Sequence, residues 1–277
     1  MANTYGLLGY PLGHTMSPPI HKALFSLYHH DADYQVFETP PDRLSETVPG
    51  LLRLYGFNIT IPYKVEIIPY LDRLDEKAQQ YHSVNVVKCG AENVGYNTDV
   101  IGFTKSIDML GASLASRVLL LGCGGVGRMM AIETAIQGGE LTIAVRPSGV
   151  PLAERAAEEI HAIFPKADVR IVLIDRISGT YDLVINATPA GMYPNTDISP
   201  VGDDIVRRAE FLFDAIYNPV ETKLIKLARA NGVKTLGGMA MLVLQAAAAH
   251  TIWNGVSFTE ADIAGITSEM EGRLMNA

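Results

Sequence analysis

The chain has 277 residues and a formal net charge of −8, with 48% hydrophobic and 19% charged residues. This length allows two domains or one large one, and the composition is that of a globular protein rather than a disordered one. The acidic charge and the lack of any Lys or Arg run argue against a nucleic-acid-binding surface, but leave room for a local phosphate pocket.

The two cysteines, Cys89 and Cys123, lie in apolar or glycine-rich contexts without metal-ligand spacing, so we expect reduced, buried thiols. The N-terminal residues lack the basic-then-apolar pattern of a signal peptide. The longest apolar stretch, residues 239–249, contains Gln245 and is too short to span a bilayer. We therefore expect a cytoplasmic protein without a membrane partner.

Short β-branched segments alternate with amphipathic stretches through the first hundred residues. Strands are predicted at residues 4–9, 34–37, 57–61, 84–88 and 93–96, and helices at 18–28, 42–55 and 62–74. This alternation is typical of βαβ units and of a mainly parallel sheet covered on both faces.

A second series of alternating elements starts near Arg117, after a predicted connecting helix at residues 99–110. Strands are predicted at residues 118–121, 141–145, 169–174, 183–185, 211–215 and 233–235, and helices at 126–137, 151–164 and 222–231. Two more helices follow Gly237 and Gly238, one through Trp253 and one from Thr259, too late in the chain to extend a sheet. The sequence therefore predicts an α/β protein with a substrate-binding domain, residues 1–103 completed by helices within 238–277, and a Rossmann domain, residues 104–237.

A glycine-rich turn, Gly122-Cys-Gly124-Gly125-Val126-Gly127, follows a predicted buried strand and opens a helix. Glycines in this pattern allow a tight turn, close backbone approach to a pyrophosphate and close helix–sheet packing. A turn without a ligand has the same letters, but the flanking strand and helix favour a dinucleotide-binding site.

The end of the next strand bears on the choice of cofactor. It reads Val145-Arg146-Pro147-Ser148, without an Asp or Glu to bind the ribose 2′-hydroxyl of NAD. Arg146 can pair with the 2′-phosphate of NADP, so NADP is favoured; the alternative is an ordinary exposed arginine.

Residues 186–192, Asn-Ala-Thr-Pro-Ala-Gly-Met, end another predicted strand of the same domain. Taken alone they indicate only a turn. At the carboxyl end of a strand in a nucleotide-binding domain, small residues and a glycine would let the backbone approach a flat ligand.

Two polar segments of the first domain each end in one ionisable side chain. Residues 58–64 read Asn-Ile-Thr-Ile-Pro-Tyr-Lys and residues 97–99 read Asn-Thr-Asp, so Lys64 and Asp99 stand among hydroxyl and amide groups. Lys64 could be a solvated lysine and Asp99 a helix N-cap. Because both segments follow strands of one predicted sheet, we interpret the cation, the carboxylate and the dinucleotide turn together as alcohol–ketone redox chemistry.

The loop after the first strand, Gly-His-Thr-Met-Ser-Pro at residues 13–18, carries the hydroxyls of Thr15 and Ser17. Ser17 and Pro18 could serve as N-cap and first helical residue, while two hydroxyls would also suit a polyhydroxylated ligand. We expect a structural role for His14 and surface positions for His29 and His30. Neither of the latter has a partner at metal-ligand spacing, so no metal is predicted.

These motifs, in this order, resemble the shikimate dehydrogenase family over nearly the whole chain. The family's Ser-x-Ser-Pro loop corresponds to residues 15–18, its Asn-Val-Thr-x-Pro-x-Lys motif to 58–64 and its Asn-Thr-Asp-x-x-Gly motif to 97–102. The glycine turn and residues 186–192 also match. The segments Tyr217-x-Pro-x-x-Thr222 and Gly238-x-x-Met-Leu-x-x-Gln245 complete the resemblance.

The resemblance implies a reversible, NADP-dependent reduction of 3-dehydroshikimate to shikimate, a step in the synthesis of chorismate and aromatic amino acids. By motif position Lys64 and Asp99 would be catalytic, and which of them takes the proton stays open. The implied substrate-binding residues are Thr15, Ser17, Thr60, Asn85, Tyr217 and Gln245. The implied cofactor-binding residues are Gly122, Gly124, Gly125, Val126, Gly127, Arg146, Thr188, Met192 and Gly238. A monomer or a homodimer is compatible with the sequence.

Three departures from the family pattern leave substrate and cofactor choice open. Thr15 stands where the family usually has Ser, residues 82–86 keep Asn85 but lose the usual Thr after it, and the cofactor segment retains only Arg146. One alternative is a quinate/shikimate dehydrogenase using NAD, and another is a non-catalytic regulator that binds shikimate or quinate. A two-lobed enzyme such as a methylenetetrahydrofolate dehydrogenase would not explain residues 97–99 and Gln245.

Overall fold

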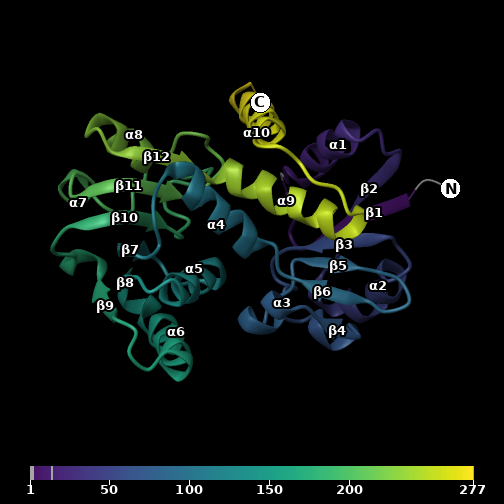
Figure 1. The fold of residues 1–277 in the computed structure, drawn as a ribbon, viewed down its shortest axis with the longest axis horizontal. Helices are drawn as coiled ribbons and strands as arrows, with labels where there is room; N and C mark the ends of the chain where they lie inside the picture. Colours follow the sequence, from purple (N-terminus) through teal and green to yellow (C-terminus); the bar gives the residue numbers. More distant parts are fainter. Residues whose placement is uncertain (1–2, 14, 277) are drawn as a thin grey trace. The chain divides into compact units, whose positions relative to one another are not determined.

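The protein is described by a computed structural model over residues 3–13 and 15–276, so His14 lies outside the described residues. The chain forms two compact units, Met1–Gly102 with Val243–Met270 and Phe103–Leu242 with Glu271–Ala277. Each unit contains one six-stranded sheet flanked by helices (Figure 1). The predicted α/β class is confirmed.

The sheet of the first unit has the strand order β2-β1-β3-β5-β6-β4. Its strands are β1 (Asn3–Gly9), β2 (Ala32–Glu38), β3 (Gly56–Ile59), β4 (Arg73–Leu74), β5 (Val86–Lys88) and β6 (Val94–Tyr96). β1 is parallel to β2 and β3, and β4 is parallel to β6, whereas β5 is antiparallel to both of its neighbours. Only residues 89–93 separate β5 from β6, too few for a helical crossover, so the two strands form a hairpin.

The direction of β5 has a consequence for its neighbours. Because β3 and β6 both run antiparallel to the strand between them, they run parallel to each other and to β1. The carboxyl ends of β1, β3 and β6 therefore lie at the same edge of the sheet.

The helix predicted at residues 62–74 is wrong. The segment forms turns, a short 3-10 helix (η2, Ile68–Tyr70) and strand β4. Pro69 offers no backbone N–H, and the buried Tyr63 hydroxyl donates to the carbonyl of Thr39, so tertiary contacts replace a helical ladder. The helix of this region comes later, as α3 (Glu76–Tyr81), and the side chain of Asp75 caps it by accepting from the backbone N–H of Ala78 at 2.8 Å.

The remaining helices of the first unit follow the prediction more closely. They are α1 (Ser17–Leu27), α2 (Leu44–Leu51) after a 3-10 turn η1 (Pro41–Arg43), and the parts of α4 (Asp99–Leu110), α9 (Gly238–Asn254) and α10 (Glu260–Met275) that belong to this unit. The α2 helix is shorter than the predicted 42–55 segment because the backbone N–H groups of Arg53 and Leu54 bond to the carbonyls of Gly50 and Leu51, three residues back, as in a turn.

Trp253 anchors α9 on the first sheet. Its side chain is 1% exposed, and its indole N–H donates to the carbonyl of Val87 on β5 at 2.9 Å. A side chain at Gly56 on β3 would overlap the indole ring, so only glycine permits this close approach. Tyr5 and Phe25 pack against Trp253 in the same apolar cluster.

A chain of buried and half-buried polar side chains connects α1 and the residue that follows it with α9. Asn254 donates to the Tyr28 hydroxyl at 3.1 Å, and the same hydroxyl lies 2.8 Å from Nδ1 of His250. Nε2 of His250 lies 2.9 Å from Nδ1 of His21, so one of these two ring nitrogens donates to the other. Both histidines are at most 2% exposed, and both are neutral in this arrangement.

The sheet of the second unit is entirely parallel, with the order β12-β11-β10-β7-β8-β9. Its strands are β7 (Arg117–Leu121), β8 (Glu140–Val145), β9 (Val169–Leu173), β10 (Tyr181–Asn186), β11 (Ala209–Asp214) and β12 (Lys234–Gly237). The helices are α5 (Gly125–Ile136), α6 (Val150–Ile163), α7 (Asp203–Val206) and α8 (Lys223–Ala230), with 3-10 turns η3 (Pro147–Gly149) and η4 (Ile174–Arg176). Counted along the chain this is the 3-2-1-4-5-6 order of the Rossmann fold, with its switch point between β7 and β10.

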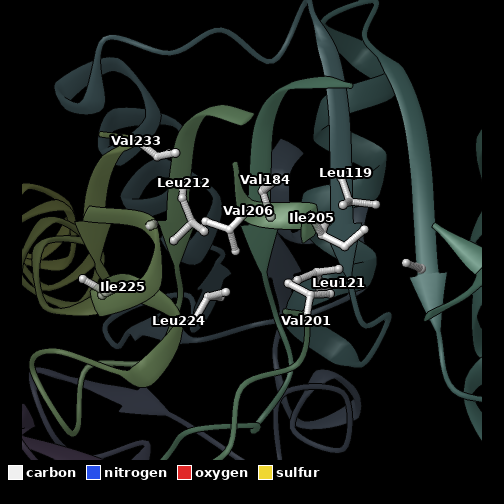
Figure 2. Close-up of a cluster of buried hydrophobic side chains, with 12 residues drawn as sticks. Leu119, Leu121, Val184, Val201, Ile205, Val206, Leu212, Leu224, Ile225 and Val233 are labelled. Carbon is white, nitrogen blue, oxygen red and sulfur yellow. The ribbon is translucent and has the colours of Figure 1, made fainter. Parts of the chain in front are cut away.

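One apolar cluster holds α7 and α8 against this sheet. Figure 2 shows Leu119, Val184 and Leu212, from three neighbouring strands, lying together with Ile205 and Val206 of α7. Every predicted strand of this unit is present, and most are one to three residues longer than predicted. The α7 helix was not predicted, because a single helical turn gives too little periodicity in the sequence to detect.

Two sequence expectations concern membranes and thiols. None of the helices in the described part of the chain is long and apolar enough to cross a membrane. Cys123 is buried and Cys89 half-buried, and burial raises the thiol pKa to about 11 for Cys123 and about 12 for Cys89. Both thiols are free and protonated near neutral pH; Cys123 is buried as predicted, whereas Cys89 is only half-buried.

We expect the two buried histidines to make the fold sensitive to acid. Burial lowers the pKa of His21 well below its ordinary value and that of His250 to about 3. Their contribution to stability is complete above the unfolded pKa of about 6.5 and is lost as pH falls towards 3, by up to about 1.4 kcal/mol per histidine per pH unit. Urea unfolding of the wild type and His250→Phe at pH 7 and pH 5.5 measures this. The variant should show the shallower pH dependence, and equal slopes would contradict the prediction.

Candidate functional site

Lys64 and Asp99 form an ion pair in the first unit. Nζ of Lys64 donates to Oδ2 of Asp99 at 2.6 Å, and the two side chains are 23% and 9% exposed. The predicted pair is therefore in contact although the residues are 35 positions apart. Lys64 lies in the turn after β3 and Asp99 directly follows the segment after β6, so the shared direction of these strands brings them together.

Asn85 holds the carboxylate of this pair. Its amide nitrogen lies 3.0 Å from Oδ1 of Asp99, 3.0 Å from Oγ1 of Thr98 and 3.1 Å from Oε1 of Gln245. Its own Oδ1 accepts the backbone N–H of Thr98 at 2.7 Å. Asn85 is 3% exposed, so these bonds fix both oxygens of Asp99, one on an amide and one on an ammonium group.

The N-terminus of α4 is capped by Asn97 rather than by Asp99. Oδ1 of Asn97 accepts the backbone N–H of Asp99 at 3.1 Å and that of Val100 at 3.4 Å. The alternative that Asp99 is merely a helix cap is therefore wrong, and its carboxylate is free to bind Lys64. A carboxylate in the first turn also faces the positive end of the helix dipole.

Of the predicted hydroxyl residues, Thr60 lies at the carboxyl edge of the sheet, and Thr15 and Ser17 lie between the end of β1 and the first turn of α1. Thr60 directly follows β3 and bonds through its backbone N–H to the carbonyl of Leu8 on β1, while Thr15 and Ser17 follow β1. Among the described residues, no hydrogen bond joins these three side chains to Lys64 or Asp99.

The predicted cap of α1 needs a correction. Ser17 is the first helical residue rather than the N-cap, which is Met16, and the side chain of Met16 makes no capping bond. Instead the backbone N–H of Ser17 donates to Oγ1 of Thr15 at 3.2 Å. Thr15 therefore bonds locally to the start of the helix.

Thr98 is a site residue that the sequence prediction did not single out. It is fully buried and bonds to Asn85 through both its backbone N–H and its hydroxyl. Its position between Asn97 and Asp99 was the only sequence signal, because a threonine before a helix is common.

The second unit carries the glycine-rich turn at the switch point of its sheet. Gly122 follows β7 with φ +87°, a conformation that favours glycine, and α5 begins at Gly125. A Cβ on Gly127 would lie 2.6 Å from the carbonyl oxygen of Gly122, so Gly127 is required for close packing of helix and turn. Gly124 and Gly125 have nothing within 4 Å of such a Cβ, so packing does not require glycine there and their backbone is open to a ligand.

Arg146 is exposed at the end of β8, next to the strand that leads into the glycine turn. Within the described part of the chain Arg146 makes no ion pair, whereas Arg128 on α5 pairs with Glu159 at 2.7 Å. The guanidinium of Arg146 is thus available to an anion.

Residues 186–192 follow β10, on the other side of the switch point. Oδ1 of Asn186 accepts the backbone N–H of Thr188 at 3.0 Å and its hydroxyl at 2.7 Å. The methyl group of Thr188 lies where a side chain of Gly122 would be, 2.7 Å from a Cβ built there. The two loops that were predicted to bind the cofactor are therefore in contact.

The other predicted site residues differ in exposure and in packing. Met192 is 45% exposed and Tyr217, in the segment after β11, is half-buried, with burial raising its pKa. Gln245 lies in the first unit on Asn85. A side chain on Gly238 would overlap the backbone of Ala215, so the protein's own packing already requires this glycine.

In the described ranges, no group of three or more His, Cys, Asp or Glu residues is arranged to hold a metal ion.

Fold and site together define the class of protein. One unit is a Rossmann-type dinucleotide-binding unit with an open glycine turn, and the other is a mixed α/β unit with a hydrogen-bonded lysine–carboxylate pair.

The chain belongs to the shikimate dehydrogenase family. Residues 7–87 match the family model described as the shikimate dehydrogenase substrate binding domain. The chain is 38% identical over 259 residues to the shikimate dehydrogenase (NADP(+)) of Caldanaerobacter subterraneus subsp. tengcongensis, with 92% of each protein covered. The sequence-based identification of the family is confirmed.

Solved structures agree with this assignment. A chorismate mutase/shikimate 5-dehydrogenase fusion protein from Clostridium acetobutylicum is similar with a TM-score of 0.89 and 33% identity, covering 100% of both chains. A shikimate dehydrogenase in complex with NADP+ is similar with a TM-score of 0.89 and 34% identity, covering 97% of this chain and 95% of that one.

The glycine turn gives a matched pair of substitutions. Gly127→Ala should lower the free energy of unfolding by roughly 1–3 kcal/mol, because its Cβ meets the Gly122 carbonyl. Gly125→Ala, at the open start of α5, should change it by no more than about 0.5 kcal/mol. Urea denaturation of both variants measures this, and a Gly127→Ala protein as stable as Gly125→Ala would refute the packing role.

Proposed function

We propose that this protein catalyses the reversible, NADP-dependent reduction of 3-dehydroshikimate to shikimate. The observation that carries the proposal is the Lys64–Asp99 pair, held by Asn85 in a chain that belongs to the shikimate dehydrogenase family. Bound NADP(H) would supply or accept the hydride, and the protein would orient the substrate and manage the proton.

Lys64 would act on the reacting oxygen of the substrate. Its ammonium group carries three protons, and the bond to Asp99 uses one of them. In the reduction, another N–H would donate to the carbonyl oxygen as the hydride reaches the carbon, and passing that proton on would leave the pair one proton short; in the oxidation, the pair in this deprotonated form would take the hydroxyl proton back. Asp99 would keep the ammonium group in place, since both of its oxygens are already bonded.

A small hydroxylated acid would suit the polar side chains that we assign to the substrate site. Thr60, directly after β3, and Thr15 and Ser17, between β1 and the first turn of α1, would offer hydroxyls, and Gln245 and Asn85 would offer amides. We assign these residues, with Tyr217 of the second unit, to substrate binding. A few placed polar groups of this kind are typical of sites that fix the orientation of a small ligand.

The cofactor would bind to the second unit. The open backbone of Gly124 and Gly125 at the start of α5 suits a pyrophosphate, and Gly122, Val126, Gly127, Thr188, Met192 and Gly238 complete the proposed site. The free guanidinium of Arg146, at the end of β8, would bind the 2′-phosphate that distinguishes NADP from NAD. The corresponding domain division is residues 1–103 with 238–277 for the substrate and 104–237 for the cofactor.

Removal of Lys64 tests the chemistry. Lys64→Ala should lower kcat with shikimate by roughly 10²–10⁴-fold, because the proton donor is lost, while the Kd for NADP+ stays unchanged. The exposed Lys22 provides a control, since Lys22→Ala should leave both constants unaltered. An unimpaired Lys64→Ala enzyme would exclude this mechanism.

The same absorbance assay separates the alternative substrates. Wild-type protein is offered shikimate and quinate, each with NADP+ and NAD+, and the appearance of reduced nicotinamide is followed. The proposal expects shikimate with NADP+ to give the highest kcat/KM. Turnover of quinate alone would indicate a quinate dehydrogenase, and binding without turnover a non-catalytic shikimate- or quinate-binding protein.

Arg146 sets the expected preference for NADP. Arg146→Ala should raise the KM for NADP+ by about tenfold or more, because a charge-assisted hydrogen bond contributes about 1.5–3 kcal/mol, and should leave the KM for NAD+ nearly unchanged. Lys166→Ala is the control, an exposed cation of the same unit. Equal effects of Arg146→Ala on both cofactors would refute the assignment.

A further inference from the structure

Asp214 is a buried carboxylate that the proposed reaction does not use. It is the last residue of β11, its side chain is fully buried, and it has no ion pair in the described part of the chain. Burial raises its pKa. Burial of a carboxylate costs free energy unless several hydrogen-bond donors stabilise it, so the donors around Asp214 indicate its role.

Three donors surround this carboxylate. Oδ1 accepts from Nδ2 of Asn186 at 2.9 Å and from the backbone N–H of Ile216 at 3.1 Å. Oδ2 accepts from the hydroxyl of Thr222 at 2.6 Å, and Thr222 in turn caps α8 by accepting from the backbone N–H of Ile225. Asp214 therefore closes residues 215–222 into a turn and ties that turn to the end of β10.

The bond to Asn186 determines which way its amide points. Because Nδ2 faces Asp214, Oδ1 must face the opposite way, and there it accepts both the backbone N–H and the hydroxyl of Thr188. The hydroxyl of Thr188 also accepts from the backbone N–H of Ala190 at 3.3 Å. Fixed in this way, the methyl group of Thr188 packs on Gly122 of the glycine turn.

We propose that Asp214 is a positioning residue for the dinucleotide site. Through Asn186 it sets the orientation of Thr188, and through Thr188 it sets the contact between residues 187–192 and the glycine turn at Gly122. This inference rests on the proposed function only in that the ligand of these two loops is NADP. Three segments that are separate in sequence, residues 214–222, residues 186–192 and the glycine turn, are thereby held in one arrangement before a ligand binds, which lowers the cost of ordering them on binding.

A double-mutant cycle on NADP+ binding tests the relay. The dissociation constant is measured by titration calorimetry for the wild type, Asp214→Ala, Thr188→Val and the double variant. Each single substitution should weaken binding by roughly tenfold, and the double variant should be little weaker than either single one, because both interrupt the same chain. If the double substitution instead raised the dissociation constant by the product of the two single effects, the proposal would be overturned.

The matched control is Asp214→Asn, which keeps a carbonyl oxygen towards Asn186 and Ile216. It should bind NADP+ within about threefold of the wild type, since only the bond to Thr222 is changed. A loss equal to that of Asp214→Ala, or a folded Asp214→Ala protein with a lower Tm and unaltered Kd, would overturn the proposal. If Asp214→Ala does not fold, Asn186→Ala replaces it in the cycle, because it interrupts the chain one residue further on.

The wild-type protein separates this inference from the proposed reaction. NADP+ binding without oxidation of shikimate would refute the reaction and leave the relay to be judged on the binding cycle. Oxidation of shikimate with unaltered NADP+ binding in the variants would refute the relay alone. A wild type that does not bind NADP+ contradicts both.

Discussion

The site depends on the direction of one short strand. Because β5 runs antiparallel to β3 and to β6, those two strands end at the same edge of the sheet and deliver Lys64 and Asp99 to one place. Asn85 directly precedes β5, and its side chain therefore lies at the same edge of the sheet, where it bonds to Asp99, Thr98 and Gln245. A parallel β5 would need a long crossover and could not place this amide beside the carboxylate.

In each unit, a buried polar residue orients a side chain that we assign to catalysis or to cofactor binding. In the first unit Asn85 orients the carboxylate that binds Lys64, and in the second Asp214 orients the amide that binds Thr188. Buried hydrogen-bonded groups are costly to misplace, so each such residue permits few alternative arrangements of its neighbours. The exposed side chains proposed to meet the cofactor, Arg146 and Met192, have no such restraint and depend on the strands that carry them.

Much of this could be predicted from the sequence, and the errors have physical causes. Strand–helix alternation and the glycine turn predicted the Rossmann unit, because parallel strands are buried on both faces and their pattern is strong. The helix at residues 62–74 was wrong because a proline and tertiary bonds of Tyr63 and Asp72 outweigh local periodicity. Asp214 was missed since it belongs to no spacing pattern, and Thr98 was missed because its place in the Asn-Thr-Asp motif does not show which residue it bonds to. The cap at Asn97 was missed because Asp99 is an equally good capping residue by type.

By itself the sequence determined the kinds of group present and their order: a lysine, a carboxylate, hydroxyls, a glycine turn and an arginine after the next strand. These follow from local chemistry, since periodicity and turn residues act over a few positions along the chain. Only the tertiary structure decided which of these groups bond to one another. The bonds of Asn85 to Gln245 and of Asp214 to Asn186 join residues separated by 160 and 28 positions, and strand order rather than spacing brings them together.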